Sequence, residues 1–323
     1  LNTTVDGARL AAPDRIAGVS ASRPLTEERF AIEAGLFLDC TGDGRLGAEA
    51  GADYTWGREA QATYGERSAP AVADCRVLGS SILFQARDYG RPMPFTPPPY
   101  ARKFTESDLA CREHVPFSYG FWWMEYGGEL DTIKDGEAIR DELYAIAMGV
   151  WDHIKNGGEH GAENWALEWI GMLPGKRESR RFLGPHVLTQ TDLEAAVLFE
   201  DRVAYGGWPI DTHPPRGIYD PGEPCHQPML PAMYSIPLRA LYSRNVHNML
   251  MAGRNISASH LAFASARVMA TCAVMGQAAG TCAALCANLE KTPRELSRDE
   301  IAGLQQALLK DDCYLLELPN RDP

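Results

Sequence analysis

The 323-residue sequence lacks any pair of cysteines at the short spacings that bind zinc or carry out dithiol chemistry. Its eight cysteines are scattered, and the closest two, Cys282 and Cys286, are four residues apart, about one helical turn. No HExxH, P-loop or GxSxG motif is present either. We therefore expect no bound metal, and we expect reduced cysteines buried as small apolar residues. Reduced thiols favour the cytoplasm, with a periplasmic or secreted location as the alternative.

Positive charge is also scarce, because 31 Lys and Arg residues stand against 43 Asp and Glu residues, giving a formal net charge of −12. This balance disfavours nucleic acids and anionic membrane surfaces as partners. The uncharged segment 268–289 is long enough to span a membrane, but small residues dominate it in place of Leu, Ile and Phe. We expect a packed helix there, with no membrane partner.

Internal repeats, low-complexity tracts and a signal-peptide pattern are absent, and the sequence begins at Leu1. At roughly 150 residues per domain, the length indicates about two domains. Short apolar runs bounded by turn residues, typical of buried strands, predict strands at three places: residues 35–40, 77–84 and 249–253.

Four segments have helical patterns. Apolar residues at steps of three and four predict an amphipathic helix over residues 133–154. A second helix is predicted near Thr191, with Thr191 and Glu194 as a capping box, and a last one is capped by Ser297 and Glu300. The longest pattern runs from about residue 261 to 289. Clusters of proline and glycine predict irregular structure at two places: residues 89–99 and 206–231.

The segment from Gly42 to Gly47 matches G-x-G-x-x-G and follows a predicted strand. A dinucleotide-binding turn is one interpretation, and an incidental turn is another. Asp43 would place a negative charge where phosphates bind, and the residues around Glu59 do not form the second strand that such a unit requires.

A third interpretation comes from the order of several motifs. Residues 37–44 read FLDCTGDG, and residues 248–257 read NMLMAGRNIS. Further matching segments are 48–52, 57–59, 180–184, 188–192, 213–219, 236–239, 267–269 and 276–280. Together they resemble the bacterial FAD-dependent oxidoreductase family, whose members are two-dinucleotide-fold flavoproteins.

This resemblance implies an α/β fold: an incomplete FAD-binding Rossmann-like domain with an inserted α+β substrate or cap region. The implied boundaries place the FAD-binding domain at residues 1–65 and 241–292, the inserted region at 66–240, and a C-terminal helix and tail at 293–323. The N-terminal GxGxxG element of the family is expected to be missing. FAD is the implied cofactor, and its implied ligands are Thr41, Gly42, Asp43, Gly253, Arg254, Asn255, Ser257 and Arg267.

Hydride transfer to a flavin requires a base and polar groups that orient the substrate. The candidate bases are His260, His213 and His226, each with a hydrogen-bonded structural role as the alternative. Arg181 is the candidate carboxylate clamp, since strand alternation sends only one of Arg180 and Arg181 into a site. Arg267 needs a partner if buried, either the cofactor or a carboxylate.

Two aromatic residues and one further histidine have both functional and structural interpretations. Trp122 and Trp123 form either a sugar-stacking surface or part of the core, and His186 is expected to be structural. The predicted function is flavin-dependent hydride transfer with a small organic substrate. The alternative is a binding or scaffold module that retains the fold without a cofactor, and a hydrolase lacks a recognisable nucleophile.

Overall fold

The computed structural model describes residues 1–158 and 160–321, which form two compact units. Unit 1 comprises Leu1–Asp74, Arg180–Asp211 and Gln227–Pro323. Unit 2 comprises Cys75–Ser179 and Thr212–His226. The chain therefore leaves unit 1 twice and returns to it twice. The boundaries between the units fall after residues 74, 179, 211 and 226.

Unit 1 contains a parallel pair of short strands, β4 (Phe37–Asp39) and β14 (Met249–Met251). Both correspond to strands predicted from apolar runs, with narrower bounds. Their side chains are almost all buried, which explains why each run is apolar on both faces. Phe37, Met249 and Met251 join a core cluster that also includes residues from the N-terminal segment, such as Ile16.

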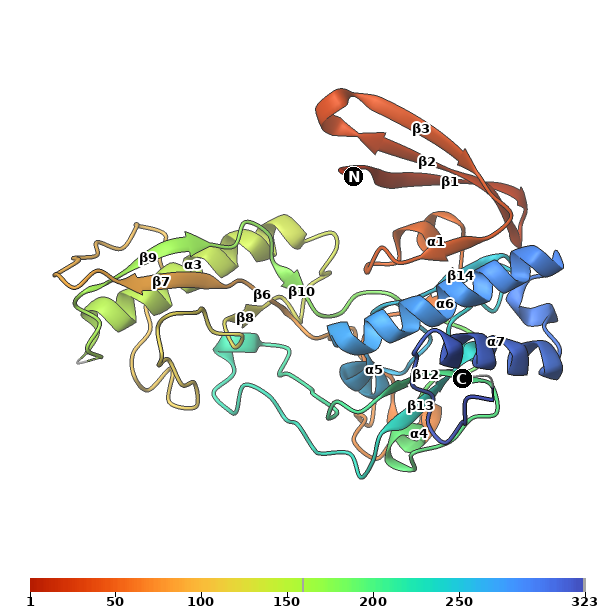
Figure 1. Cartoon of the computed structure of the whole chain (residues 1–323). Coiled ribbons are helices and arrows are strands. Elements are labelled where there is room, and N and C mark those ends of the chain that lie inside the picture. The colour runs from red at the N-terminus through yellow and green to blue at the C-terminus, as the bar shows by residue number, and fades with distance from the viewer. Residues whose placement is uncertain (159, 322–323) are drawn as a thin grey trace. The chain divides into compact units, whose positions relative to one another are not determined.

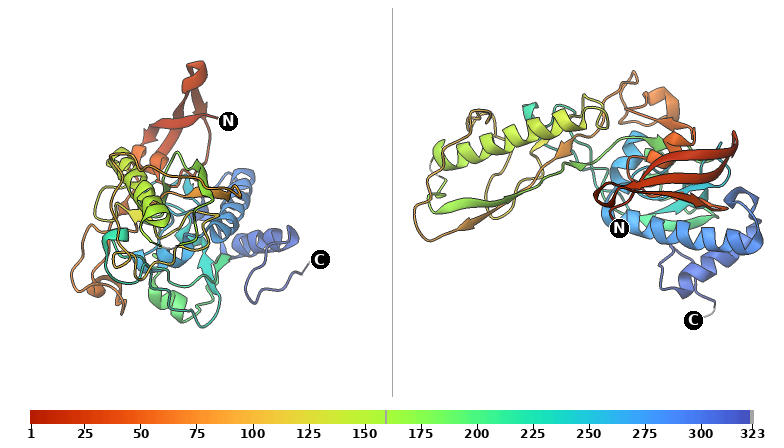
Figure 2. Two further views of the ribbon diagram at one scale, coloured as in Figure 1. Left: turned by 90° about the vertical axis from the view of Figure 1, so that its left-hand side faces the viewer. Right: turned by 90° about the horizontal axis from the view of Figure 1, so that it is seen from above.

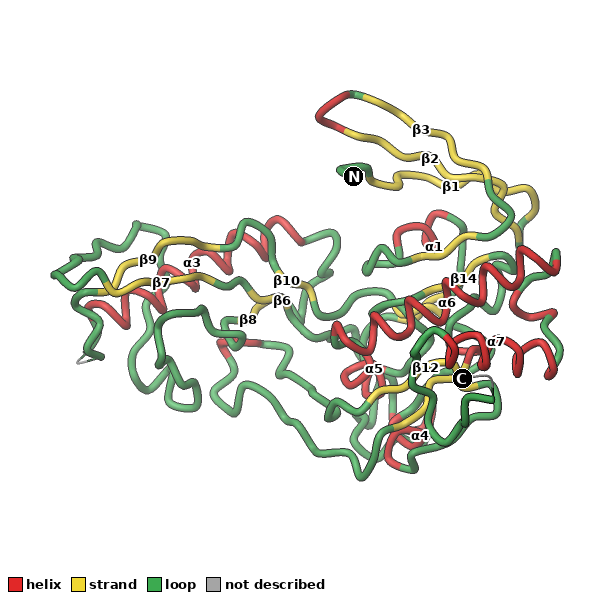
Figure 3. Tube along the Cα trace, in the orientation of Figure 1, coloured by secondary structure: helices red, strands yellow, loops and turns green. Residues whose placement is uncertain are grey.

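Three small antiparallel sheets complete the strands of unit 1 (Figures 1 and 3). The N-terminal sheet contacts the short helix α1 (Arg45–Glu49) through its first strand. The strands of that sheet are β1 (Thr4–Ala12), β2 (Arg15–Arg23) and β3 (Glu28–Glu33). The other two sheets are pairs: β5 (Tyr54–Thr55) with β11 (Arg181–Phe182), and β12 (Arg202–Gly206) with β13 (Tyr234–Pro237).

The helical pattern over residues 261–289 forms two helices, α5 (His260–Ala266) and α6 (Met269–Leu289), and the prediction of one continuous helix was wrong. The backbone is extended at Val268, the residue that follows Arg267. Helix α6 packs against β12, β14 and α7 (Arg298–Lys310) (Figure 2). By length and composition α6 is apolar enough to cross a membrane, which for a single helix is weak evidence, since core helices meet the same criterion.

Capping boxes were predicted for two helices, and one of the two predictions was correct. Helix α7 begins with the predicted capping box of Ser297 and Glu300. Helix α4 (Gln190–Glu194) instead uses Thr189 and Asp192, not Thr191 and Glu194. Thr189 has the extended backbone that a cap needs, whereas Thr191 already lies inside the first turn. The remaining short helix of unit 1 is α2 (Gln61–Tyr64).

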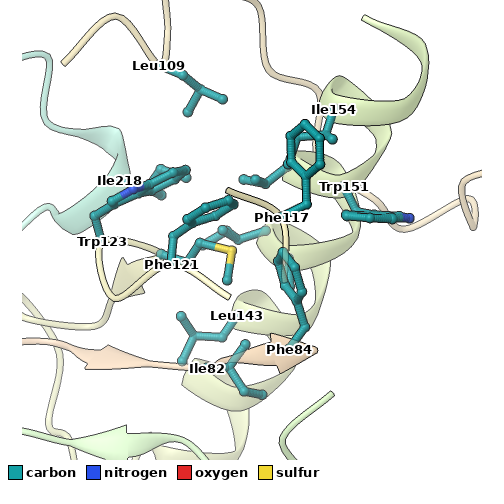
Figure 4. Close-up of a cluster of buried hydrophobic side chains, with 14 of the residues drawn as sticks. Ile82, Phe84, Leu109, Phe117, Phe121, Trp123, Leu143, Trp151, Ile154 and Ile218 are labelled. Atoms are coloured by element: carbon teal, nitrogen blue, oxygen red, sulfur yellow. The ribbon is translucent and has the colours of Figure 1, made fainter. Parts of the chain in front are cut away.

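Unit 2 is built around the amphipathic helix α3 (Gly136–Asn156), as predicted. Its apolar face packs on the antiparallel pair β7 (Phe84–Asp88) and β9 (Trp165–Ile170) (Figures 1 and 4). The predicted strand over residues 77–84 is mostly irregular: Ser80–Ser81 form β6, and Phe84 begins β7. The partners of β6 are β8 (Glu125–Tyr126) and β10 (Gly175–Lys176).

Loops make up much of unit 2, including the predicted irregular segment 89–99 (Figure 3). Trp123 is buried and stacks on Phe121, which confirms its core interpretation, whereas Trp122 is about half exposed. All eight cysteines lie among the described residues and are free thiols. Only Cys282 and Cys286 are fully buried, so the expectation that all eight are buried was wrong: Cys40, Cys75 and Cys111 are exposed.

Candidate functional site

The turns that follow β4 and β14 lie together in unit 1. The two strands are parallel, and Met251 is paired with Asp39, so both strands end at the same edge. Segments 41–43 and 253–255 leave from that edge. In α/β folds, ligands bind beyond the carboxyl ends of parallel strands. Six of the eight predicted cofactor-binding residues therefore belong to one site.

The turn after β4 is organised by the fully buried carboxylate of Asp39. Its Oδ1 accepts hydrogen bonds from the backbone N–H of Thr41 (2.9 Å) and from the Thr41 hydroxyl (2.7 Å). Its Oδ2 accepts from the Gly47 N–H at 2.8 Å, and Thr41 Oγ1 accepts from the Arg45 N–H at 2.7 Å. Thr41 thus shapes the turn with its hydroxyl. Asp39 was not among the predicted site residues, and its place in the matching motif was the only signal for it.

Two glycines allow the turns to approach other groups closely. Gly42 has a φ of +77° and Gly253 a φ of +111°, both in the region that favours glycine. A Cβ on Gly42 would lie 3.1 Å from a guanidinium nitrogen of Arg254, so this side chain lies directly over the first turn. At Gly253 the nearest such atom is Asn255 Oδ1, at 3.7 Å. A Cβ at Gly253 would therefore make an ordinary van der Waals contact with Asn255 and no clash.

Two arginines surround Asp43. Arg254 donates to Asp43 Oδ1 at 2.7 Å, and Arg180 donates to the Asp43 backbone carbonyl at 3.1 Å. The guanidinium of Arg180 also lies over the Tyr54 ring, 5.5 Å from its centre. These cations offset the negative charge of Asp43, which had counted against a phosphate-binding turn. Strand alternation does separate the two neighbouring arginines: Arg180 reaches the turn, whereas Arg181, the predicted one, binds Glu59.

Asn255 is fully buried and carries a polar atom without a partner. Its amide nitrogen donates to the Asp39 backbone carbonyl at 3.1 Å. Its Oδ1 accepts no hydrogen bond from any residue that the structure describes. An unsatisfied buried acceptor costs about 1–3 kcal/mol, so such atoms usually meet a ligand or water. This oxygen is the clearest indication that the site receives a donor from outside the chain.

Arg181 is fully buried and binds within the protein. Its guanidinium donates to Glu59 Oε1 and to the Gly57 carbonyl, both at 2.7 Å, and to the Ala258 carbonyl at 3.1 Å. Glu59 in turn accepts from the His260 N–H at 2.9 Å. Arg181 and Glu59 therefore hold the start of α5, where the predicted base His260 lies buried.

Glu66 is a second buried carboxylate at the start of α5. It accepts hydrogen bonds from the Gln190 N–H and from the hydroxyl of Ser259, the N-cap of α5. Burial raises the pKa of Glu66 above its ordinary value, more than these hydrogen bonds lower it.

The side chains of Ser257 and Arg267 form hydrogen bonds with residues of unit 1 that lie outside the two turns. The Ser257 hydroxyl donates to the His186 backbone carbonyl at 2.6 Å and is fully buried. Arg267 donates to Asp211 Oδ2 at 2.8 Å, so the partner found is a carboxylate, one of the two expected alternatives. His186 Nε2 lies 3.1 Å from Asp192 Oδ2, and this contact is consistent with the structural role expected for His186.

The other two candidate histidines belong to unit 2, where His213 has a buried acidic partner. His213 Nδ1 lies 2.7 Å from Glu125 Oε2, and both side chains are almost fully buried. Glu125 also accepts from the Gly79 N–H at 2.7 Å and lies 3.3 Å from Arg177. The Trp122 ring meets the His213 ring edge-on at 5.5 Å. No feature of the sequence pointed to Glu125.

His226 differs from His213 because its side chain is exposed. Its backbone pairs with Thr212 through two hydrogen bonds of 2.8 and 3.0 Å, which close the loop between them. The structure therefore shows a role for the His226 backbone in holding that loop.

One cavity of unit 1 is lined by residues outside the two turns. Its volume is about 680 Å³, and its lining includes Phe199, Arg239 and Gln305. A second cavity of about 600 Å³ is lined by residues before β4 and at the end of α6, among them Leu36 and Lys291. Neither lining contains a residue of the two turns.

A site at the carboxyl edge of a parallel pair, formed by glycine turns and arginines, is typical of α/β proteins that bind anionic cofactors. In a comparison with models of protein families, residues 1–308 match the family described as FAD dependent oxidoreductase. The chain belongs to this family, which indicates FAD as its cofactor and a Rossmann-like α/β fold. A search of curated proteins and a search of solved structures each find no match.

Proposed function

We propose that unit 1 binds FAD at the turns after β4 and β14, and that the protein exchanges a hydride between FAD and a small organic substrate. Membership of the family supports a flavin-dependent oxidoreductase in general. The observation that carries the finer proposal is the parallel pairing of β4 with β14, which places both glycine turns at one edge.

The residues of this edge fit the cofactor. The unpaired Oδ1 of Asn255 is an acceptor for a flavin N–H group. Arg254 and Arg180 supply positive charge toward a pyrophosphate or a reduced flavin. Gly42 and Gly253 let the two turns adopt backbone conformations with positive φ. Thr41 and Asp43 hold the first turn in shape, one through Asp39 and the other through Arg254.

FAD, when bound, supplies the two-electron chemistry. The chain has to bind the cofactor, orient the substrate and accept a proton. Among the three candidate bases, His213 has a buried carboxylate partner, Glu125, which fixes the orientation of its ring as a carboxylate does in many acid–base pairs. His260 and His226 are the second and third candidates for the proton acceptor. Arg181 contributes by holding the start of α5 in position.

The cofactor proposal is tested by titrating the purified protein with FAD and following the quenching of flavin fluorescence. Arg254→Ala removes one charged hydrogen-bond donor from the edge, and such a loss corresponds to roughly tenfold or more weaker binding. The matched control is Arg298→Ala, because Arg298 is highly exposed and far along the chain on α7. We expect wild type and Arg298→Ala to bind alike and Arg254→Ala to bind more weakly.

The titration also separates the proposal from its alternative. A folded wild-type protein that does not bind FAD would favour the binding or scaffold module without a cofactor. Equal binding by wild type and Arg254→Ala would show that FAD binds away from this edge.

His213 is tested by the pH dependence of substrate oxidation. His213→Gln should lower kcat by about a hundredfold or more, since a positioned base contributes roughly 10²–10⁴-fold. His226→Gln, with its exposed side chain, should leave kcat close to wild type. A normal rate and an unchanged pH profile in His213→Gln would assign His213 a structural role.

A further inference from the structure

Three histidines and a glutamate of unit 2 converge on one point, although the sequence separates them widely. They are Glu106, His114, His153 and His160, and one ligand atom from each lies within 4.8 Å of all the others. His153 comes from the last turn of α3, and the other three come from loops. The cluster is separate from the two turns of unit 1 and from the His213–Glu125 pair.

The distances among the four ligand atoms suit a tetrahedral ion. His114 Nε2 lies 2.9 Å from His160 Nε2, and His153 Nε2 lies 3.0 Å from Glu106 Oε2. Glu106 Oε2 lies 3.6 Å from His160 Nε2 and 3.8 Å from His114 Nε2. For zinc with ligand distances of about 2.0–2.1 Å, tetrahedral geometry separates neighbouring donor atoms by about 3.3 Å. The four distances between ligand atoms lie on both sides of this value.

The tautomer of His114 is fixed by a neighbour outside the cluster. Its Nδ1 lies 2.8 Å from the Arg112 backbone carbonyl, which can only accept a hydrogen bond, so Nδ1 carries the proton. The Nε2 of the neutral ring then presents its lone pair to the cluster. A histidine bonded through one nitrogen to a carbonyl, with the other free to coordinate, is the usual arrangement of a metal ligand.

The surroundings also favour a cation. The C-terminal end of a helix carries partial negative charge, and His153 lies in the last turn of the 21-residue helix α3. The side chains of His153 and His114 are buried beside the apolar cluster of unit 2, whose members include Ile154 and Ala162. Glu106 is largely exposed and leaves a path for the ion from solvent.

We propose that Glu106, His114, His153 and His160 bind one zinc ion as a closed structural site. Three imidazoles and a carboxylate are ligands that zinc accepts, and four protein ligands fill its tetrahedral shell. The ion would tie the loop of residues 106–114 to the end of α3 and to the segment that follows. The spacing of these residues matches no familiar zinc motif, which is why the sequence led to the expectation of no metal.

The test uses tag-free full-length chain, treated with a chelator and then titrated with zinc chloride. Calorimetry and elemental analysis should give about one zinc per chain, and zinc should raise the melting temperature. Cobalt(II) should give the visible bands of a tetrahedral site. Glu106→Gln and His160→Ala should each weaken zinc binding by roughly tenfold or more. His247→Ala removes a partly exposed histidine of unit 1 and should bind zinc as wild type does.

Circular dichroism checks that the variants fold, and the exposed Glu106 provides a variant that leaves the buried rings in place. Absence of zinc binding by the wild-type chain would overturn the proposal. Equal zinc affinity of wild type, Glu106→Gln and His160→Ala would overturn it as well, because the ion would then bind elsewhere.

Discussion

Gly42 is the single residue whose replacement most directly probes the turn after β4. Its φ of +77° strains any other residue, and a Cβ would meet the Arg254 guanidinium at 3.1 Å. We expect Gly42→Ala to lower the free energy of unfolding by about 1–3 kcal/mol. Urea denaturation of the variant and the wild type measures this difference.

The control for this substitution is Gly280→Ala in α6. Gly280 is helical and exposed, and a Cβ there meets no atom within 4 Å. Alanine should therefore stabilise the protein by roughly 0.5–1 kcal/mol. Opposite signs for the two variants are expected, and a neutral Gly42→Ala would contradict the described turn.

Glu66 makes stability depend on pH. Burial raises the pKa of Glu66 in the folded protein above its ordinary value of 4.5. The unfolded chain then loses the proton first as pH rises, so the contribution of Glu66 to stability is fully present below pH 4.5 and is lost as pH rises through the folded pKa. Glu66→Gln keeps an acceptor for the Gln190 N–H but does not titrate.

We therefore expect Glu66→Gln to gain stability relative to the wild type between acidic and neutral pH. Urea unfolding of both proteins across this range measures the change. Parallel pH profiles would show that the pKa of Glu66 is the same in the folded and unfolded states.

Which residue types gather at the site followed from the sequence, but the direction of each side chain did not. Strand alternation predicted that at most one of Arg180 and Arg181 enters the site. The choice of Arg180 over Arg181 depends on Glu59, which is far away in sequence and binds Arg181. In the same way, Glu125 became visible as the partner of His213 only in the folded chain.

At the scale of elements, the cap of α4 gives a clear test. Thr189 accepts from the Asp192 N–H, whereas Thr191 is exposed inside the helix. Thr189→Ala should cost about 1 kcal/mol of unfolding free energy, the usual value of such a cap. Thr191→Ala should have little effect, and thermal melting of the two variants distinguishes them. A larger loss of stability for Thr191→Ala than for Thr189→Ala would favour the capping box of Thr191 and Glu194 that the sequence predicted.

Local patterns predicted some elements well because their causes are local. The period of apolar residues in α3 reports a helix with one buried face, and the Ser297 box marks the start of α7. The break between α5 and α6 has a distant contact beside it, since Arg267 binds Asp211 from another segment of the chain. Most apolar residues of the run at 77–84 are buried, but strand pairing inside the run is limited to Ser80, Ser81 and Phe84.

At the scale of the whole molecule, the ordered motifs predicted the family, which the match over residues 1–308 confirms. The exact division into units was beyond the sequence, because unit 1 gathers three separate stretches of chain. The cluster of Glu106 with three histidines likewise arises from loops and one helix end that only folding brings together.

Binding of FAD by this chain is the central claim, and an absorption spectrum tests it most directly. The purified protein, incubated with FAD and freed of unbound cofactor by gel filtration, should retain the flavin band at about 450 nm. We expect about one flavin per chain, released on denaturation. A folded protein that elutes colourless after this treatment would contradict the account.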